Sequence, residues 1–363
     1  MQFADIFLRI AEQGLARQDQ KTGAMPPGHN GPYLDPETPV RNTAHWIQTY
    51  LAADRMAGDR KFLEAARACA DYLVGPVVPK TGAVYQHRSK EGKDSCNGLI
   101  GPAWTIEGLC AGYDAFGDRR YLDAATQYFL AHPFSPSTKR WSRVEPDGEI
   151  LTEDMTFNHQ LWFCMAGALL WKSDLSEAIA TVNVFMDDIG DNVSIASNGR
   201  IAHSIVTGRS SIKRQVKRIL KPGFRKAELQ REVGYHAFNL YAFAVLRTLL
   251  PEKAFWSSGP MKLACAYQGN HEFVSLIDHS PYGFAYNPPG FEIPFINDVF
   301  SWPVISESSD EQWLSRQLDR VLDPGTAMLS RNNPDSETLT ARIYECSRFS
   351  ERLFALPVES LSR

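Results

Sequence analysis

The fold is decided by two short stretches of the chain, Gly58-Asp59-Arg60-Lys61-Phe62-Leu63-Glu64-Ala65-Ala66 and Gly117-Asp118-Arg119-Arg120-Tyr121-Leu122-Asp123-Ala124-Ala125. The second begins 59 positions after the first, and each follows an apolar stretch with helical spacing. Each copy predicts a helix, a tight Gly-Asp turn, and a second helix whose paired alanines allow close packing. A pattern that recurs at such a period indicates a tandem array of helical hairpins.

The helical pattern continues beyond these two units. A third unit begins at residues 151–162 and a fourth at Gln230, and further helices are predicted at Gln312 to Leu322 and Leu339 to Leu353. At roughly 60 residues per hairpin, the 363-residue chain holds about six of them. We therefore predict an all-α protein with little β structure, in which six hairpins of a single domain, residues 1–363, close into a ring.

The composition indicates a globular protein without a nucleic-acid partner. Hydrophobic residues make up 44% of the chain, as expected for a globular protein. The 38 Lys and Arg nearly balance the 42 Asp and Glu, so the chain has no large positive net charge that would attract a nucleic acid. The six cysteines show no CxxC spacing, and charged residues, Asp5, Arg9 and Glu12, interrupt the apolar residues near the N-terminus. We therefore expect reduced thiols, no signal peptide and a cytoplasmic location.

In a ring of hairpins the inner helices converge, so the loops that lead into them line one mouth of the ring. Polar and aromatic residues gather at these positions: Arg41, His45, Trp46, Asn97, Trp104, Asp154, Asn158, His159, Trp162, Glu232, Tyr235, His236 and Tyr282. A sugar ring stacks on aromatic rings through its C–H face, and its hydroxyls need directional polar partners. This composition predicts an oligosaccharide or polysaccharide ligand, although the tryptophans are explained equally well as core residues.

Cleaving a glycosidic bond requires a proton donor and a group that activates water or abstracts a proton. The candidates are Asp154, Glu232, His159, Tyr235 and His236. Some also have a structural explanation, Asp154 as a helix cap and Glu232 to His236 as a capping box with a core histidine. The adjacent Asn158 and His159 are harder to explain structurally, because two polar groups on a buried helix must both find partners.

The sequence indicates a site without a cofactor. Its nine histidines show neither HxH nor HExxH spacing, and no cysteine pair supports a zinc site. The phosphate-binding patterns GxGxxG and GxxxxGK[ST] do not occur. We therefore predict neither a metal nor a nucleotide cofactor.

In length and hairpin order the chain resembles the (α/α)6-barrel, or (α/α)6-toroid, carbohydrate-active enzymes, and among them it is most similar to the unsaturated glucuronyl and rhamnogalacturonyl hydrolases. The similarity covers roughly residues 1 to 350. In that family an Asp at the start of the third inner helix is the general acid and base, and Glu153-Asp154-Met155 is similar to this segment. The resemblance implies a glycoside hydrolase acting on a saccharide that contains a uronic acid. Asp154 would protonate the C4=C5 double bond of an unsaturated uronate before water adds at C5, and His159 or His236 would assist.

A second resemblance leaves the reaction open. An Asn-His pair in the third hairpin, here Asn158 and His159, followed by Tyr235, is similar to the toroid polysaccharide lyases. There the Asn neutralises the uronate carboxylate, and a Tyr or His takes the C5 proton. A uronate C5-epimerase would use the same proton abstraction. The β-sandwich and export signal usual in those lyases are not visible in this sequence.

A basic segment runs from Arg209 to Lys226, where Lys and Arg are interleaved with apolar residues at helical spacing and no acidic residue occurs. We predict an insertion at about residues 208–228, either a solvated segment or a cationic amphipathic helix that makes a peripheral membrane contact. The alternative to an enzyme is a non-catalytic glycan-binding protein of a polysaccharide-assembly system that uses this segment to contact a membrane or a partner.

Overall fold

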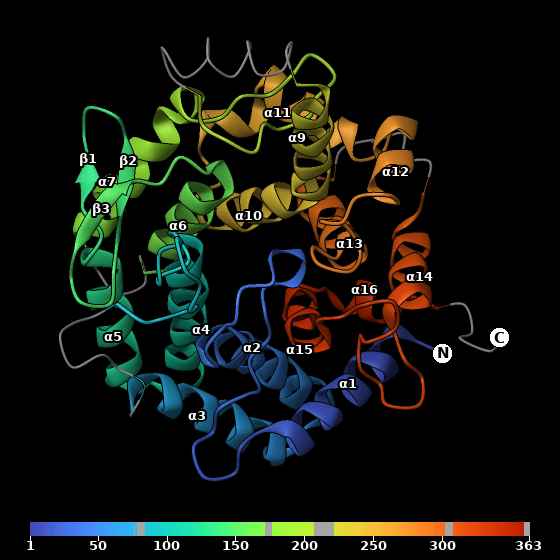
Figure 1. The fold of residues 1–363 in the computed structure, drawn as a ribbon. Helices are drawn as coiled ribbons and strands as arrows, with labels where there is room; N and C mark the ends of the chain where they lie inside the picture. Colours follow the sequence, from blue (N-terminus) through green and yellow to red (C-terminus); the bar gives the residue numbers. More distant parts are fainter. Residues whose placement is uncertain (76, 78–83, 171–175, 207–220, 302–307, 359–363) are drawn as a thin grey trace.

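The computed structural model describes residues 1–75, 77, 84–170, 176–206, 221–301 and 308–358, and its helices form a closed ring (Figure 1). The α-helices are α1 Phe3–Arg17, α2 Val40–Ala57, α3 Arg60–Val74, α4 Ile100–Phe116, α5 Arg119–Leu130, α6 Phe157–Leu169, α7 Ser176–Asp187, α9 Pro222–Gly234, α10 His236–Leu249, α11 Gly259–Tyr267, α12 His271–Ile277, α13 Pro289–Phe300, α14 Asp310–Val321, α15 Ser336–Ala341 and α16 Glu351–Phe354. The 3-10 helices are η1 Gly31–Tyr33, η3 Ile189–Asp191, η4 Ala254–Ser257 and η5 Arg342–Arg348, and the strands are β1 Phe134–Ser135, β2 Arg140–Val144 and β3 Ile150–Glu153.

The inner wall of the ring consists of α2, α4, α6, α10, α13 and the last segment, α15 with η5 (Figure 1). Neighbours in this order pack against each other, and η5 returns to α2, which closes the ring. The inner helices are buried on nearly all sides, as in α2, where every residue from Val40 to Ala53 is buried. Outer helices such as α3 bury only one face, as their amphipathic pattern requires. The predicted all-α ring of hairpins is confirmed.

The repeated Gly-Asp turns join inner to outer helices as predicted. Gly58 and Gly117 follow α2 and α4 in the left-handed conformation, with φ of 64° and 67°. Asp59 and Asp118 then cap α3 and α5, each accepting a hydrogen bond from the backbone amide two residues further on. Glycine tolerates this positive φ without strain, and Asp is a preferred N-cap. The sequence repeat therefore encodes the same turn between an inner and an outer helix at two places in the chain.

A small three-stranded antiparallel sheet, in the order β1-β2-β3, lies between α5 and α6. Strand β3 ends at Glu153, and the next amide, that of Asp154, donates to the carbonyl of Trp141 in β2 at 3.3 Å. On α6, the side chain of Gln160 bonds both the N–H and the carbonyl of Trp141, at 3.0 and 2.8 Å. The sheet therefore fixes where Asp154 enters α6.

The fourth unit is not one continuous helix from Gln230 to Leu250, because the chain turns within it. Helix α9 ends at Gly234, α10 begins at His236, and Tyr235 between them has φ −102° and ψ 3°. These angles lie in the bridge region between helix and strand. The turn gives the neighbouring Tyr235 and His236 different surroundings.

The predicted helix from Leu339 to Leu353 is wrong as a single element, since α15, η5 and α16 replace it. In a 3-10 helix, side chains three residues apart lie directly above one another. This spacing places Arg342 over Glu345, and the guanidinium Nε donates to the carboxylate at 3.0 Å. The 3-10 geometry of η5 therefore brings together the two side chains of a buried ion pair.

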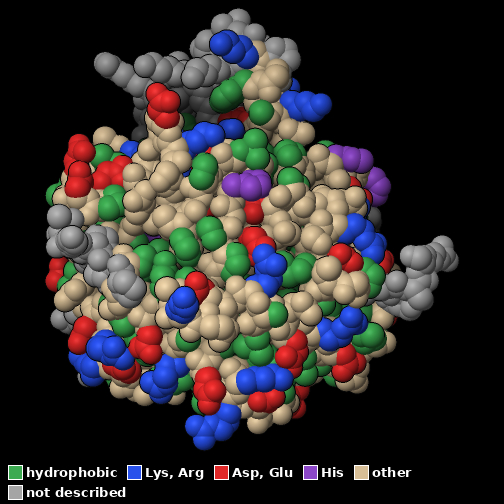
Figure 2. Space-filling model, turned by 60° about the horizontal axis from the view of Figure 1, so that its bottom comes forward, with side chains coloured by type: hydrophobic (Ala, Val, Ile, Leu, Met, Phe, Trp, Pro, Cys, Tyr) green, Lys and Arg blue, Asp and Glu red, His purple; other side chains and the backbone are tan. Residues whose placement is uncertain are grey.

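The structure bears on several properties of the whole chain. All six cysteines are free and buried, as expected for reduced thiols. Within the described ranges, no helix combines the length and apolar character needed to cross a membrane. On the face seen in Figure 2, basic and acidic side chains are intermixed around the lower edge. Of the basic insertion predicted at about residues 208–228, residues 208–220 lie outside the described residues, and α9 begins at Pro222.

Candidate functional site

A cavity of about 300 Å³ lies at the end of the ring where α4, α6 and α10 begin. Loops and first helical turns supply its lining: Asn30, Tyr33, Arg88, Lys93, Asn97, Ile100, Trp104, Thr156, Asn158, His159, His203, Arg231, Tyr235, Phe238, Tyr286 and Asn287. Of the residues predicted from the sequence, Asn97, Trp104, Asn158, His159 and Tyr235 therefore lie together on this cavity.

His159, in the first turn of α6, forms a hydrogen-bonded pair with Asp154. The His159 Nδ1 and Asp154 Oδ2 atoms are 2.7 Å apart, and the Asp154 oxygens also accept the backbone amides of Leu99 at 3.1 Å and Thr156 at 3.0 Å. Burial alone would raise the pKa of Asp154, but His159 and these amides outweigh it and lower this pKa to about 2. The ionised carboxylate keeps Nδ1 as a donor, which leaves Nε2 as the acceptor nitrogen of His159, a residue that lines the cavity.

Gly98 makes room for this pair. Its φ is 63°, and a Cβ at this position would lie 2.3 Å from Nδ1 of His159 and 2.5 Å from Oδ2 of Asp154. The Gly98 amide donates to the carboxylate of Asp94 at 2.8 Å, which holds the loop in place. The preceding Asn97 is also left-handed, with φ 57°. The lack of space beside the Asp154–His159 pair therefore requires glycine at position 98, and glycine also adopts the positive φ without strain.

Tyr235 extends its hydroxyl into a group of phenols. Its oxygen lies 2.8 Å from the Tyr33 hydroxyl, and its ring lies 4.6 Å from that of His203, centroid to centroid. Burial raises the pKa of Tyr235 well above its usual range, and nearby Tyr286 adds to the effect. Tyr235 is therefore a neutral phenol at physiological pH, a proton donor at the cavity wall.

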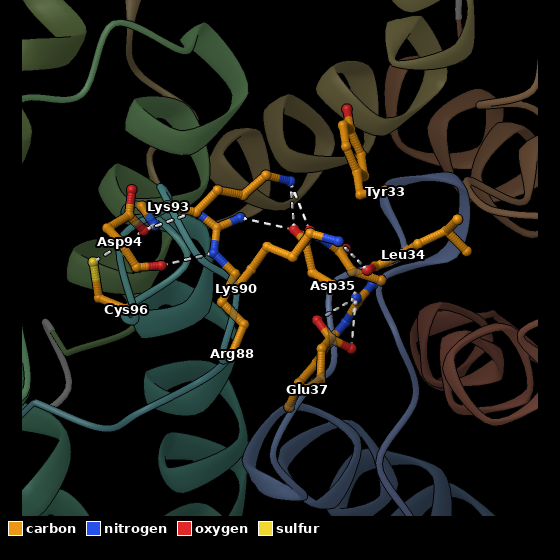
Figure 3. A network of polar contacts seen from close by, with 12 residues as sticks. Tyr33, Leu34, Asp35, Glu37, Arg88, Lys90, Lys93, Asp94 and Cys96 are labelled. Atoms are coloured by element: carbon orange, nitrogen blue, oxygen red, sulfur yellow. Dashed lines mark hydrogen bonds and ion pairs between the residues drawn. The ribbon is translucent and has the colours of Figure 1, made fainter.

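The charged residues that line the cavity are cationic. They are Arg88, Lys93 and Arg231, and none of the lining residues within the described ranges is Asp or Glu. Arg88 and Lys93 both pair with the buried Asp35, at 3.2 and 2.7 Å (Figure 3). Arg231 donates to the Tyr282 hydroxyl at 3.3 Å. Asp35 therefore partly neutralises the cations of the lining.

Arg41 and His45 are fully buried on α2, behind the cavity wall. The Arg41 guanidinium lies 4.1 Å from the ring centroid of Trp104 and pairs with Glu37 at 3.0 Å. The His45 ring stacks on Tyr344 at 4.1 Å and meets Trp104 edge-on. The structure therefore places both residues where they support Trp104 from behind.

The other two predicted tryptophans pack in the core. Trp162 is fully buried and stacks on Phe238, with ring centroids 4.4 Å apart. Trp46 packs beside Gly14 of α1, where a Cβ would lie 2.2 Å from the indole ring. Neither residue is among the cavity-lining residues.

Glu232, His236 and Tyr282 also lie outside the cavity lining. Glu232 pairs with Arg200 at 2.9 Å, and His236 is buried with Nε2 2.9 Å from the carbonyl of Ala264. Tyr282 packs behind the lining phenols, with ring centroids 5.6 Å from Tyr33 and 5.8 Å from Tyr235.

Several lining residues are not among the sequence candidates: Asn30, Tyr33, Arg88, Lys93, His203 and Arg231. The Pro- and Gly-rich residues 25–39 mark a shaped loop that includes Asn30 and Tyr33. His203 carries no comparable local signal. It reaches the cavity because its carbonyl accepts the amide of Phe157 at 2.9 Å.

No protein-family model matches the sequence. Archaeal glycosylation protein Q of Haloferax volcanii is 37% identical over 364 residues, covering 96% of this chain and 97% of the relative. Identity at this level over nearly the full length of both means that the chain belongs to the family of archaeal glycosylation protein Q.

Solved structures with the same architecture are more distant in sequence. D-mannose isomerase matches with a TM-score of 0.63 at 10% identity, over 95% of this chain and 96% of the other. Cellobiose 2-epimerase from Spirochaeta thermophila matches with 0.60 at 12%, over 97% of each. An α-1,6-mannanase variant of Salegentibacter matches with 0.60 at 9%, over 96% and 98%. These similarities confirm the (α/α)6 toroid, while the narrower resemblance to unsaturated uronyl hydrolases stays a prediction.

Proposed function

We propose that this protein is a carbohydrate-active enzyme that transfers a proton at a carbon of an acidic sugar, with His159 as the general base. The Asp154–His159 pair carries the proposal. It presents one imidazole nitrogen to the cavity while the buried carboxylate stabilises the imidazolium that forms. The cationic lining supports a uronic-acid residue as the part of the saccharide that binds.

In the proposed reaction, Nε2 of His159 takes the proton from C5 of the uronate. The electron pair moves into the uronate carboxylate, which hydrogen bonds from the cavity-lining Asn158 amide would stabilise. If the Tyr235 hydroxyl then returns a proton to the opposite face of C5, the product is the C5 epimer. If the same intermediate expels its C4 oxygen, the product is an unsaturated uronate, as in a lyase.

Hydrolysis with Asp154 as the acid is the second candidate, favoured by the position of Asp154 just before the third inner helix. The state of Asp154 weakens it, because a carboxyl group with a pKa of about 2 holds no proton to donate near neutral pH. In a hydrolase of this geometry, protonated His159 would be the donor.

The comparisons support a carbohydrate substrate. The relative from Haloferax volcanii is named for glycosylation, and the structural neighbours include an isomerase, an epimerase and a mannanase of sugars. An epimerase and an isomerase rearrange a sugar without cleaving it, in agreement with proton transfer as the main step.

The reaction is tested by incubating the protein with uronic-acid oligosaccharides in D2O. We expect deuterium at C5, detected by NMR and mass spectrometry, with chain length unchanged for an epimerase. A lyase would instead generate absorbance from unsaturated uronate, and a hydrolase would generate reducing ends without deuterium at C5. His159→Gln should reduce C5 exchange by about 100-fold or more.

The control is His271→Gln, which changes an exposed histidine on α12 in the same way and should keep full exchange. Exchange that persists in His159→Gln would refute the assignment of His159. Reducing ends without C5 exchange would replace the proposal with hydrolysis.

A further inference from the structure

The hydroxyls of Tyr33 and Tyr235 lie 2.8 Å apart at the cavity wall, although 202 positions separate the two residues in sequence. Both line the cavity. Tyr235 is 5% exposed, whereas Tyr33 is only partly buried and lies between exposed Pro32 and Leu34. A hydrogen bond between phenols therefore joins a buried proton donor to a residue at the cavity rim.

A second phenol near Tyr235 is already committed elsewhere. The Tyr286 hydroxyl donates to Oδ1 of Asn30 at 2.7 Å, and Arg41 donates to the same oxygen at 3.1 Å. The Tyr286 proton is therefore engaged with Asn30, while the Tyr286 oxygen also shares a hydrogen bond with Tyr235. Tyr33 differs from Tyr286 in being partly exposed, so it is the phenol bonded to Tyr235 that can exchange a proton with water.

The loop that carries Tyr33 is held rigidly against the loop of residues 88–94. The buried carboxylate of Asp35 binds Arg88 at 3.2 Å and Lys93 at 2.7 Å, and Arg88 continues to Asp94 at 2.9 Å (Figure 3). Between Tyr33 and Asp35, Leu34 is left-handed with φ 52°, which is strained for a residue with a side chain. This network therefore fixes Tyr33 before any ligand binds.

Two cationic side chains lie near the ring of Tyr33. The Lys93 ammonium lies 5.2 Å from the centroid of the Tyr33 ring. Arg231 lines the same cavity and donates to the hydroxyl of Tyr282, whose ring packs on Tyr33 at 5.6 Å. Arg231 favours a phenolate at Tyr33, but burial has the larger effect and keeps the pKa of Tyr33 well above its usual range, so a phenolate formed there readily takes a proton from water.

We infer that Tyr33 is a proton-relay residue that reprotonates Tyr235 between turnovers, an inference that rests on the proposed function. Tyr235 gives its hydroxyl proton to the sugar carbon and becomes a phenolate. The Tyr33 hydroxyl proton then crosses the 2.8 Å bond to Tyr235, and Tyr33 becomes the phenolate. Tyr33 recovers a proton from water at the cavity mouth, while His159 releases the proton it took. Each cycle therefore leaves the protein unchanged.

The test compares the first turnover with the steady state in Tyr33→Phe. Because resting Tyr235 already carries its proton, we expect a first turnover within about twofold of wild type by rapid quench. Steady-state kcat should fall by about 10- to 100-fold, and KM should change less than about threefold. Tyr235→Phe should lose the first turnover as well. Tyr85→Phe, which removes a remote buried hydroxyl bonded to the Leu73 carbonyl, should leave both rates unchanged.

The outcomes separate the relay from the reaction it serves. A normal steady-state rate in Tyr33→Phe, with His159→Gln inactive, would refute the relay and leave the proposed function standing. Equal loss of the first and later turnovers would also refute it, because that is the effect of misplacing Tyr235. No C5 exchange in the wild type would overturn both. Thermal unfolding of each variant near the wild-type temperature excludes misfolding as the cause.

Discussion

At the scale of single residues, the candidate site depends on close approach between backbone and catalytic side chains. Gly98 touches the Asp154–His159 pair directly, whereas Gly117 in the second Gly-Asp turn has the same type of backbone conformation in open space. The two glycines therefore share a conformational requirement but differ in what surrounds them. Substituting alanine at each glycine therefore distinguishes two effects. Both substitutions strain the backbone at a positive φ, but only the one at position 98 also places a methyl group against the Asp154–His159 pair.

We predict that Gly98→Ala disrupts the pair and Gly117→Ala does not. Each alanine must adopt a φ near 65°, which lowers the free energy of unfolding by about 1 kcal/mol. Gly98→Ala adds a clash within 2.3 Å of His159, so its free energy of unfolding should fall further and the imidazole should move. Chemical denaturation measures the first effect, and 15N NMR of the His159 ring measures the second. Equal destabilisation with an unchanged His159 signal would contradict the assignment.

At the scale of elements, α10 shows how one turn separates two neighbouring polar residues. His236 at its first position is buried, with Nε2 donating to a carbonyl and Nδ1 accepting the amide of Ile201 at 3.4 Å. Both nitrogens are satisfied in the neutral form. Burial lowers the pKa of His236 to about 4. The residue is therefore sensitive to acid without facing the cavity.

We predict that His236 makes the protein less stable as the pH falls. An unfolded histidine takes up its proton near pH 6.5 and the folded one only near pH 4, so the stabilisation is complete above pH 6.5 and is lost toward pH 4. The loss attributable to His236 is on the order of 2 kcal/mol at pH 5. Urea unfolding between pH 7 and pH 5 should show a shallower decline for His236→Gln than for wild type.

The test compares how steeply the free energy of unfolding falls with pH in the wild type and in His236→Gln. This comparison is needed because other buried groups also make stability depend on pH between pH 7 and pH 5. Burial lowers the pKa of His87 to about 3 and of His132 to about 4, which adds to the acid sensitivity. Burial raises the pKa of Glu345 to about 7, which acts in the opposite direction. The difference between wild type and variant cancels these shared contributions, and identical slopes would contradict the prediction.

Local signals explain which elements and site residues could be predicted. The Gly-Asp turns depend on caps within a few residues, and Asn158 and His159 share the first turn of one helix. Tyr33 and His203 are placed at the cavity by contacts with segments that are distant in the sequence. Their positions along the chain therefore do not indicate that they belong to the site. The separation of Tyr235 from His236 depends on a turn after Gly234, where tertiary packing overrides the helical pattern.

At the scale of the whole molecule, a buried network of charges joins the last units of the ring. The Arg342 guanidinium of η5 binds Glu292 of α13 at 3.0 Å and Asn287 at the cavity at 3.0 Å, and it also pairs with Glu345. Arg342, Glu292 and Glu345 are all fully buried. A single cation therefore serves two acidic side chains that water does not reach, and burial together with neighbouring Glu345 raises the pKa of Glu292 well above its usual range.

We predict that Arg342→Met destabilises the protein by about 3–5 kcal/mol, because it leaves buried carboxylates without their partner. Arg119→Met removes an exposed pair with Asp123 and should cost at most about 1 kcal/mol. Adding Glu292→Gln to Arg342→Met should recover part of the loss. Denaturant unfolding measures all three, and similar values for the two Arg variants would mean that the network contributes little.

The closure of the ring has a consequence for the order of its parts. Gln2 and Pro357 form a β-bridge, and the amide of Phe3 donates to the carbonyl of Leu356 at 3.0 Å. The first and last hairpins are therefore neighbours in space, like any other two. A circularly permuted gene, with Met1 and Val358 joined by a short linker and new termini opened in the Gly58 turn, should encode the same ring. Hairpin order along the chain could then change in evolution without moving a side chain of the cavity.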